Sequence, residues 1–146
     1  MNFREMTPAD LPDTFRIRTA AKENPFPMEA LISSGITEAS VTQMLATTHR
    51  GWVCEVDGNT VGFAIGNRSN GELWVIAVLS EHEGKGVGRH LMQLVQDWLW
   101  SEGWTKLWLV TGVAPSRAFH LYSKLGWQDC GPVGEGVERR MELTQI

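Results

Sequence analysis

The sequence predicts an α/β protein (mixed α+β), a mixed central sheet with helices on both of its faces. Three observations predict it. Short apolar segments bounded by turn residues are typical of strands, and longer segments with apolar residues at helical spacing are typical of helices. The order of these segments places antiparallel hairpins before a strand–helix–strand unit, which forms a parallel pair.

Length, composition and charge narrow the class of protein. The 146 residues, 42% hydrophobic and 21% charged, fit one globular domain over residues 1–146. The formal net charge is −4, and no cluster of Lys and Arg forms the basic stripe of a nucleic-acid binder. Cys54 and Cys130 lack metal-ligand spacing, so we expect neither a metal nor a disulfide framework. Without a signal peptide or a membrane-spanning run, we expect a cytoplasmic protein with no membrane partner.

The N-terminal third of the chain predicts one strand and two helical regions. The strand covers residues 2–6, and Thr7 and Pro8 are suited to the cap and first turn of a helix. That helix is expected to run towards Lys22, because the stretch at 24–27 contains two prolines that break it. The later part of the second region has a cap and an apolar stripe, formed by Thr37, Val41, Met44 and Leu45.

The middle of the chain predicts three strands joined by tight turns. Asp57-Gly58 is a strong hairpin signal, and Asn70-Gly71 marks a second turn. The strands are expected at 51–56, 61–65 and 73–79. The last of them is a nearly continuous apolar run, so we expect it to be buried on both faces.

The remainder of the chain alternates helices and strands. A helical stripe runs from Val87 to Leu99, and Gly103 is suited to end that helix. The unit from Leu73 to Val110 should therefore be a right-handed parallel crossover. The later elements are a buried strand at 107–110, a helical stripe at 118–125 that Gly126 stops, and a last strand around 138–143.

A glycine-rich turn before the Val87 helix is the segment most informative about function. It reads Glu83-Gly84-Lys85-Gly86-Val87-Gly88-Arg89. The alternating glycines let the backbone approach a ligand closely, and the free N–H groups of a helix start favour a phosphate or pyrophosphate. Lys85 and Arg89 add positive charge at the same place. The alternative is a plain glycine-rich turn with solvated charges.

Two common phosphate-binding motifs do not fit this turn. A Walker loop needs Ser or Thr after its Gly-Lys pair, but Lys85 is followed by Gly86. The dinucleotide fingerprint G-x-G-x-x-G needs a last glycine where this chain has Arg89 or Leu91. The turn must therefore belong to another class of phosphate-binding loop, or to none.

The turn resembles the coenzyme A loop of the GNAT acetyltransferases, Gln/Arg-x-x-Gly-x-Gly/Ala. Gly86 and Gly88 match its two small positions, and in that family the amides of the loop hold the pyrophosphate of the coenzyme. Glu83 stands where the family has Gln or Arg, and a carboxylate repels a pyrophosphate unless it points to solvent. The resemblance therefore implies a backbone role for residues 83–89, with acetyl-coenzyme A as the co-substrate.

A second motif agrees with the first. The segment from Ala118 to Trp127 is similar to the family pattern A-x-x-L-Y-x-x-x-G-F, with a tryptophan as the aromatic residue. The family often has Asn three residues before that alanine, where this chain has Pro115, so the contact of that Asn with the coenzyme is absent or replaced. The resemblance covers essentially the whole order of elements. It implies a sheet whose two central parallel strands splay apart to admit acetyl-coenzyme A.

The resemblance also implies roles for two titratable residues. In the family, the tyrosine at the position of Tyr122 protonates the departing thiolate. The reaction needs such a proton donor, because coenzyme A is expelled more easily as a thiol than as an anion. Glu72 lies fourteen residues before Gly86, a spacing similar to that of the catalytic glutamate in the histone-acetyltransferase branch, and could accept a proton from the amine. The alternatives are a core tyrosine and an exposed turn glutamate. Weaker candidates for the base are Glu55, His82 and His120.

The strand before the turn is expected to contact the coenzyme through its backbone. In the family, main-chain groups of this strand, here Ile76-Ala77-Val78, pair with the pantetheine arm, and an amide there polarises the thioester carbonyl. The acceptor site should be built from Ala20 to Thr48 and the strand ends near Asn67 and Arg68. An apolar wall from Phe26, Met28 and Trp52 is one interpretation, and core packing is the other.

Three functions compete on this evidence. The first is an N-acetyltransferase that acts on the primary amine of a small molecule. The second is the same reaction on a protein N-terminus or lysine, and the third is a non-catalytic domain that binds coenzyme A for regulation. The presence of Tyr122 favours the two enzymes, and a homodimer is one assembly that the sequence leaves open.

Overall fold

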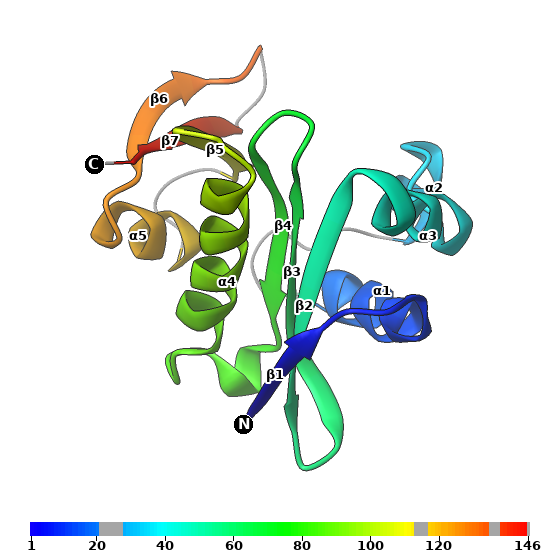
Figure 1. Cartoon of the computed structure of the whole chain (residues 1–146). Helices are drawn as coiled ribbons and strands as arrows, with labels where there is room; N and C mark the ends of the chain where they lie inside the picture. The colour runs from blue at the N-terminus through cyan, green and yellow to red at the C-terminus, as the bar shows by residue number, and fades with distance from the viewer. Residues whose placement is uncertain (21–27, 113–116, 135–137, 146) are drawn as a thin grey trace.

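In a computed structural model of the chain, seven described strands form one mixed sheet with helices on both faces (Figure 1). The structure describes residues 1–20, 28–112, 117–134 and 138–145. The strand order is β1-β2-β3-β4-β5-β7-β6. The strands are β1 Asn2–Glu5, β2 His49–Val56, β3 Asn59–Asn67, β4 Glu72–Val78, β5 Lys106–Thr111, β6 Gln128–Pro132 and β7 Arg139–Thr144.

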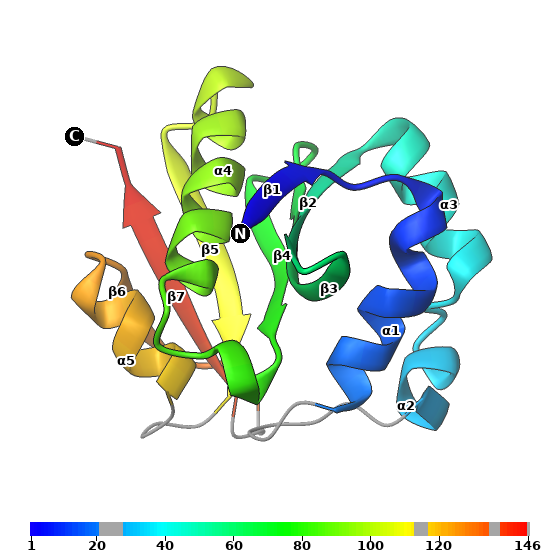
Figure 2. The same ribbon diagram turned by 90° about the horizontal axis from the view of Figure 1, so that it is seen from below.

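The helices divide between the two faces of this sheet. Seen from below, α4 and α5 lie on one side of the strands and α1, α2 and α3 on the other (Figure 2). Their bounds are α1 Leu11–Thr19, α2 Met28–Ser33, α3 Glu38–Thr47, α4 Val87–Ser101 and α5 Arg117–Lys124, with short 3-10 turns at Pro8–Asp10 and Ser80–His82. No helix in the described ranges is long and apolar enough to cross a membrane.

The fold class and most of the predicted elements are confirmed. The hairpin turn at Asp57-Gly58 has positive φ at both residues, and Gly103 and Gly126 follow the ends of α4 and α5 with φ 99° each. Thr37 caps α3 as predicted, because its side chain accepts a hydrogen bond from the Ser40 N–H at 3.1 Å. These signals succeed because each depends on a few adjacent residues.

The first helix differs in detail from the prediction. Thr7 and Asp10 form a capping box around the 3-10 turn at Pro8–Asp10, and α1 begins only at Leu11. The carboxylate of Asp10 also accepts two N–H groups of Arg4, which fixes β1 against this turn. The helix ends at Thr19. The predicted end at Lys22 and the breaker at 24–27 lie outside the described residues, as does Pro115.

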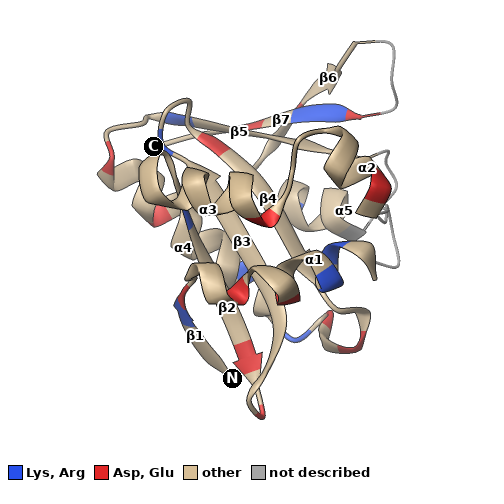
Figure 3. Ribbon diagram, turned by 90° about the vertical axis from the view of Figure 1, so that its right-hand side faces the viewer, with Lys and Arg blue, Asp and Glu red and all other residues tan. Residues whose placement is uncertain are grey.

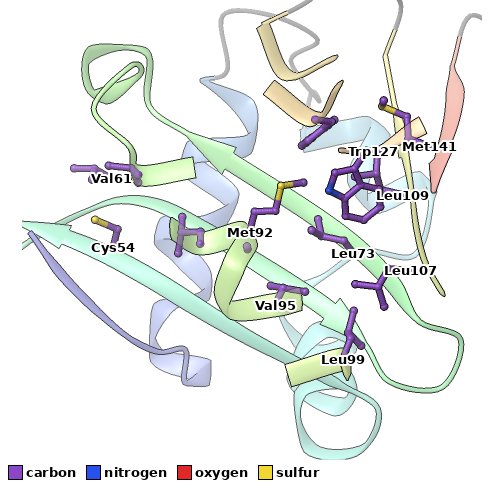
Figure 4. Packing of buried hydrophobic residues seen from close by; sticks show 14 residues of the cluster. Cys54, Val61, Leu73, Met92, Val95, Leu99, Leu107, Leu109, Trp127 and Met141 are labelled. Atoms are coloured by element: carbon purple, nitrogen blue, oxygen red, sulfur yellow. The ribbon is translucent and has the colours of Figure 1, made fainter. Parts of the chain in front are cut away.

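Among the described residues, two clusters of buried side chains form the core, one on each face. The α4–α5 cluster includes Leu73, Leu107, Leu109 and Met141 from the sheet, and Figure 4 shows them around Met92, Val95 and Trp127. The α1–α3 cluster instead covers strands β2, β3 and part of β4, with Phe63 and Ile65 at its centre. On the α1–α3 face, the core therefore stops near β4, and β5 and β7 extend beyond it.

Helix α4 packs on β3 at two glycines. A Cβ atom at Gly66 would lie 2.7 Å from Val95 Cγ1, and one at Gly62 would lie 3.1 Å from Val87 Cγ1. Both distances are shorter than ordinary carbon–carbon contacts. The absence of side chains at Gly62 and Gly66 thus sets how closely α4 approaches the sheet, and with it the position of the helix start.

The two central strands part soon after they meet. β4 and β5 are parallel, as predicted, but their ladder contains only the pair Glu72↔Trp108. β4 also carries a bulge, because Gly66 and Ile65 of β3 face Leu73 and Val75 and leave Trp74 as an extra residue. A bulge bends its strand and increases the twist, which directs β4 away from β5.

The expectation that β4 is buried on both faces is wrong. Only Leu73 is buried along this strand, and Trp74 to Val78 are partly exposed. The apolar run is real, but burial on both faces requires a neighbouring strand and helices along the whole length. Once β5 has departed, the second half of β4 has, among the described strands, a partner on its β3 side alone.

Candidate coenzyme and acceptor site

The turn before α4 presents an open helix start. Gly86 is the N-cap residue with φ 86°, Gly84 has φ 77°, and within the described residues no side chain caps α4. The first N–H groups of a helix have no partner within the helix, so they are free to bind a ligand oxygen. The helix dipole and the exposed side chains of Lys85 and Arg89 favour an anion there.

The space around this turn fits a ligand. A Cβ atom at Gly86 would have no heavy atom within 4 Å, so the backbone is open to the surroundings. A Cβ atom at Gly88 would lie 3.7 Å from both Val78 Cγ2 and Leu121 Cδ2. The turn, the end of β4 and helix α5 therefore meet at one place. Val87 is buried, so its side chain anchors the turn and only its backbone is available.

The unpaired edge of β4 begins beside this turn. Ile76, Ala77 and Val78 pair with Ala64, Phe63 and Gly62 of β3, and no described strand pairs with their other edge. Main-chain N–H and C=O groups on an unpaired edge must find partners, and an extended ligand can supply them. The arrangement is suited to an extended amide-containing chain, such as the pantetheine arm of coenzyme A.

Tyr122 lies on α5 directly after Leu121, whose Cδ2 lies 3.7 Å from a Cβ atom placed at Gly88. Its side chain is 5% exposed and packs in the α4–α5 cluster, with its ring centroid 6.3 Å from that of Trp127. Burial raises the pKa of the Tyr122 hydroxyl above its usual value, so it stays protonated at neutral pH. Among the described residues, the buried side-chain atom without a hydrogen-bond partner is Nε1 of the neighbouring Trp127. Packing thus holds the ring of Tyr122 in place.

Glu72 lies at the opposite end of β4, where the sheet is still closed. It is half-buried and paired in register with Asn67 of β3 and Trp108 of β5. Burial raises the pKa of its carboxyl, while a hydrogen bond with Asn70 and the charge of Arg140 oppose that rise. A raised pKa is a shift in the direction that suits a general base.

The other candidates for the base lie elsewhere. Glu55 is on β2 and pairs with Arg4 of β1 at 3.0 Å, on the far side of the sheet from β5. His82 lies in the 3-10 turn before the glycine-rich turn, and His120 is exposed on α5. None of the three lies on β4 or β5, where those strands meet.

The structure brings together residues near Glu72 that the sequence did not single out. The guanidinium of Arg18 lies 5.4 Å from the ring centroid of Trp74, and the ring of His49 meets the same indole edge-on at 5.1 Å. Burial lowers the pKa of Arg18 to about 10 and the pKa of His49 below its usual value. The contacts of Arg18 and His49 with Trp74 depend on the bulge at Trp74. This sequence contains no signal that predicts a bulge there.

The predicted acceptor segment is only partly described. Met28 begins α2 and is exposed, Trp52 packs edge-on against Trp98 of α4, and Phe26 lies outside the described residues. Trp52 therefore belongs to the core edge, on the opposite face from α1–α3. A cavity of about 300 Å³ does occur near Arg68, but it faces the start of β2 and the ends of α3 and α4, not the glycine-rich turn.

The open helix start before α4 and the unpaired edge of β4 are features of an acyl-coenzyme A binding fold. Comparison with known proteins identifies the family. The family model described as "Acetyltransferase (GNAT) family" matches residues 11–127. The chain belongs to this family, as the two sequence motifs predicted.

Curated relatives include acetyltransferases from rodents and from a bacterium. The chain is 28% identical over 112 residues to N-acetyltransferase family 8 member 2 of Rattus norvegicus, covering 70% of this chain and 50% of that protein. It is 37% identical over 79 residues to the streptothricin acetyltransferase of Streptomyces lavendulae, covering 51% of this chain and 42% of that protein. The chain thus matches about half or less of the length of these relatives.

Solved structures share the fold along the whole chain. The PaiA N-acetyltransferase of Thermoplasma acidophilum, solved in complex with coenzyme A, superposes with a TM-score of 0.81 at 15% identity and 99% coverage of both chains. The ribosomal-protein-S18-alanine N-acetyltransferase of Escherichia coli gives a TM-score of 0.72 at 22% identity, covering 99% of this chain and 92% of that one. At these identities the likeness concerns the fold alone.

Proposed function

We propose that the protein transfers the acetyl group of acetyl-coenzyme A to the primary amine of a small molecule. One observation carries the proposal: beyond the point where β4 leaves β5, the unpaired edge of β4 leads to an uncapped helix start whose glycine has open space around it. An unpaired strand edge and an anion-binding turn at one end of it suit an extended, amide-containing molecule that ends in a pyrophosphate.

The residues present fit the coenzyme, and each chemical group of the coenzyme would be bound by a different part of the chain. The amides of residues 84–89 would hold the pyrophosphate, and Lys85 and Arg89 would add charge. The main chain of Ile76 to Val78 would pair with the pantetheine arm, and an amide of this strand would polarise the thioester carbonyl. The coenzyme supplies the activated acetyl group when bound, and the chain supplies the proton movements.

Two proton transfers are assigned to side chains. Glu72, directly or through a water molecule, accepts a proton from the ammonium form of the acceptor, which leaves the neutral amine able to attack. The C–N bond forms as the C–S bond breaks, and Tyr122 donates its hydroxyl proton to the departing sulfur. The attacking nitrogen loses its second proton to water, and water returns a proton to Tyr122. Because burial keeps Tyr122 protonated, the donor is present across the pH range in which Glu72 titrates.

The class of acceptor is the least constrained part of the proposal. The name of the streptothricin acetyltransferase supports a small molecule, whereas the name of the Escherichia coli neighbour supports a protein N-terminus as the second candidate. The cytoplasmic location, the single domain and a homodimer stand as predictions from the sequence.

A thiol-release assay with acetyl-coenzyme A tests the function. The acceptors would be polyamines, amino acids, amino sugars and short peptides with free N-termini or lysines. Turnover with a small amine supports the proposal, and turnover with peptides alone replaces it with the protein-directed reaction. Binding of coenzyme A in calorimetry without turnover on any acceptor would indicate the regulatory domain instead.

A further inference from the structure

A row of charged and aromatic side chains crosses three strands on the face that α1–α3 leave uncovered. Leu107, Leu109 and Met141 point into the α4–α5 cluster, so alternation places Trp108 of β5 and Glu142 of β7 on the other face. Trp108 is in register with Glu72 on one side and with Glu142 on the other. Figure 3 views this face and shows the basic residues of β7 and the acidic start of β4.

Arg140 lies across this row in a fixed position. Its guanidinium carbon is 4.5 Å from the ring centroid of Trp108, and its Nε donates to Glu142 Oε2 at 2.9 Å. The indole of Trp108 is itself anchored, since its Nε1–H donates to the carbonyl of Asn70 at 3.0 Å. Stacking and the Nε hydrogen bond leave a planar guanidinium little freedom, and they use neither of its terminal amino groups.

We infer that Arg140 is a positioning residue that keeps the carboxylate of Glu72 ionised for its role as base. The inference deepens the proposed function and rests on it. Trp108 separates Glu72 from Glu142 in the row, and Arg140 lies on that indole, so its positive charge stands between two carboxylates. Glu142 is already neutralised in part by Lys106, whose Nζ is 3.6 Å from Oε1. Arg140 binds Glu142 directly at 2.9 Å, and its field also reaches Glu72, where burial disfavours the charge.

Other charged groups near Glu72 are engaged elsewhere. Arg18 stacks on Trp74, and Arg68 binds the carbonyl of Thr47 and pairs with Glu102 at 3.8 Å. Burial of His49 lowers its pKa, so at neutral pH it carries no charge. Lys106 of the neighbouring strand β5 extends to Glu142, and Arg140 of β7, although it also pairs with Glu142, lies on the indole of Trp108 next to Glu72. Among these described cations, Arg140 is thus the one that we assign to oppose the burial of this carboxylate.

The direct test follows the Glu72 carboxyl carbon by ¹³C NMR against pH in the free protein, with Glu72→Gln to assign the signal. In Arg140→Gln the midpoint should move to higher pH by about one unit, because removal of a nearby opposite charge disfavours the carboxylate. Arg140→Lys should recover much of the shift. Arg139→Gln is the matched control: it removes the same charge one residue away, on the opposite face, where Arg139 pairs with Asp129 at 2.8 Å.

The acidic limb of the rate–pH profile should move in the same direction and by the same amount. A Glu72 midpoint in Arg140→Gln that coincides with wild type, in a variant with native melting behaviour, overturns the inference. An equal shift in Arg139→Gln overturns it too, because then only net charge matters. A midpoint that moves while the rate profile does not would leave Arg140 in its role and refute Glu72 as the base.

Discussion

The body and the start of helix α4 use glycine for opposite reasons. Along the body, Gly66 is required because a Cβ atom there would collide with Val95 at 2.7 Å. At the start, Gly86 has φ 86° and nothing within 4 Å of a built Cβ. The first glycine lets helix and sheet touch, and the second keeps a backbone bare towards open space. Glycine permits close packing at position 66 and leaves the backbone accessible at position 86. The sequence alone does not distinguish these two uses.

The largest effect should come from a side chain on the bare backbone. In Gly86→Val, coenzyme A affinity should fall by at least roughly 100-fold, because the side chain fills the approach to the amides and disfavours positive φ. Isothermal titration calorimetry measures the affinity. Gly103→Val is the matched control at the other end of α4, since Gly103 has φ 99° and open space too. If both variants bind coenzyme A like wild type, the turn is not the pyrophosphate site.

Glu72→Gln tests whether the closed end of β4 takes part in the chemistry. Turnover should fall by roughly 100-fold or more, the contribution of a positioned general base. Burial raises the pKa of Glu72, so the wild-type activity should be lost on acidification at a pH above the ordinary glutamate value of about 4.3. The rate–pH profile of the variant should lack that acidic limb. A fully active variant would assign the proton to water or to another group, such as His49.

The side chain of Tyr122 is buried in the α4–α5 cluster, but its proposed role is at the open coenzyme site. Tyr122→Phe keeps the ring in the core and removes only the hydroxyl, so turnover should fall by roughly 100-fold. Stability should change by no more than about 1 kcal/mol, the net worth of one hydrogen bond. Thiol release at saturating substrate and thermal melting measure the two quantities. Equal turnover refutes the acid role, and a large loss of melting temperature would make Tyr122 a structural residue alone.

Gly66→Ala should give the smallest effect and the opposite pattern. The added methyl group overpacks the α4–β3 contact, which costs typically about 1–3 kcal/mol of folding free energy. Chemical denaturation measures this loss. Coenzyme A affinity of the folded fraction should stay at the wild-type value, because the turn is untouched. If Gly66→Ala weakens binding as much as Gly86→Val does, the body and the start of α4 are coupled and the comparison above fails.

Local signals predicted most of the fold and the coenzyme half of the site. Turn dipeptides, the Thr37 cap and the glycines after α4 and α5 act over a few residues, so the sequence alone shows them. The motif at residues 83–89 is equally local. The burial of β4 was mispredicted because it is not a local property. It depends on where β5 lies, and β5 begins 28 residues after β4 ends.

By itself the sequence determined the order of the elements, the family and the turn that presents free amides. Only the tertiary structure decided what surrounds Glu72. Residues 72, 108 and 140 come from three strands far apart in the chain, and their meeting depends on strand register and on the bulge at Trp74. Register is a property of paired strands and not of any one segment, so the row of Glu72, Trp108 and Arg140 exists only once the sheet has formed.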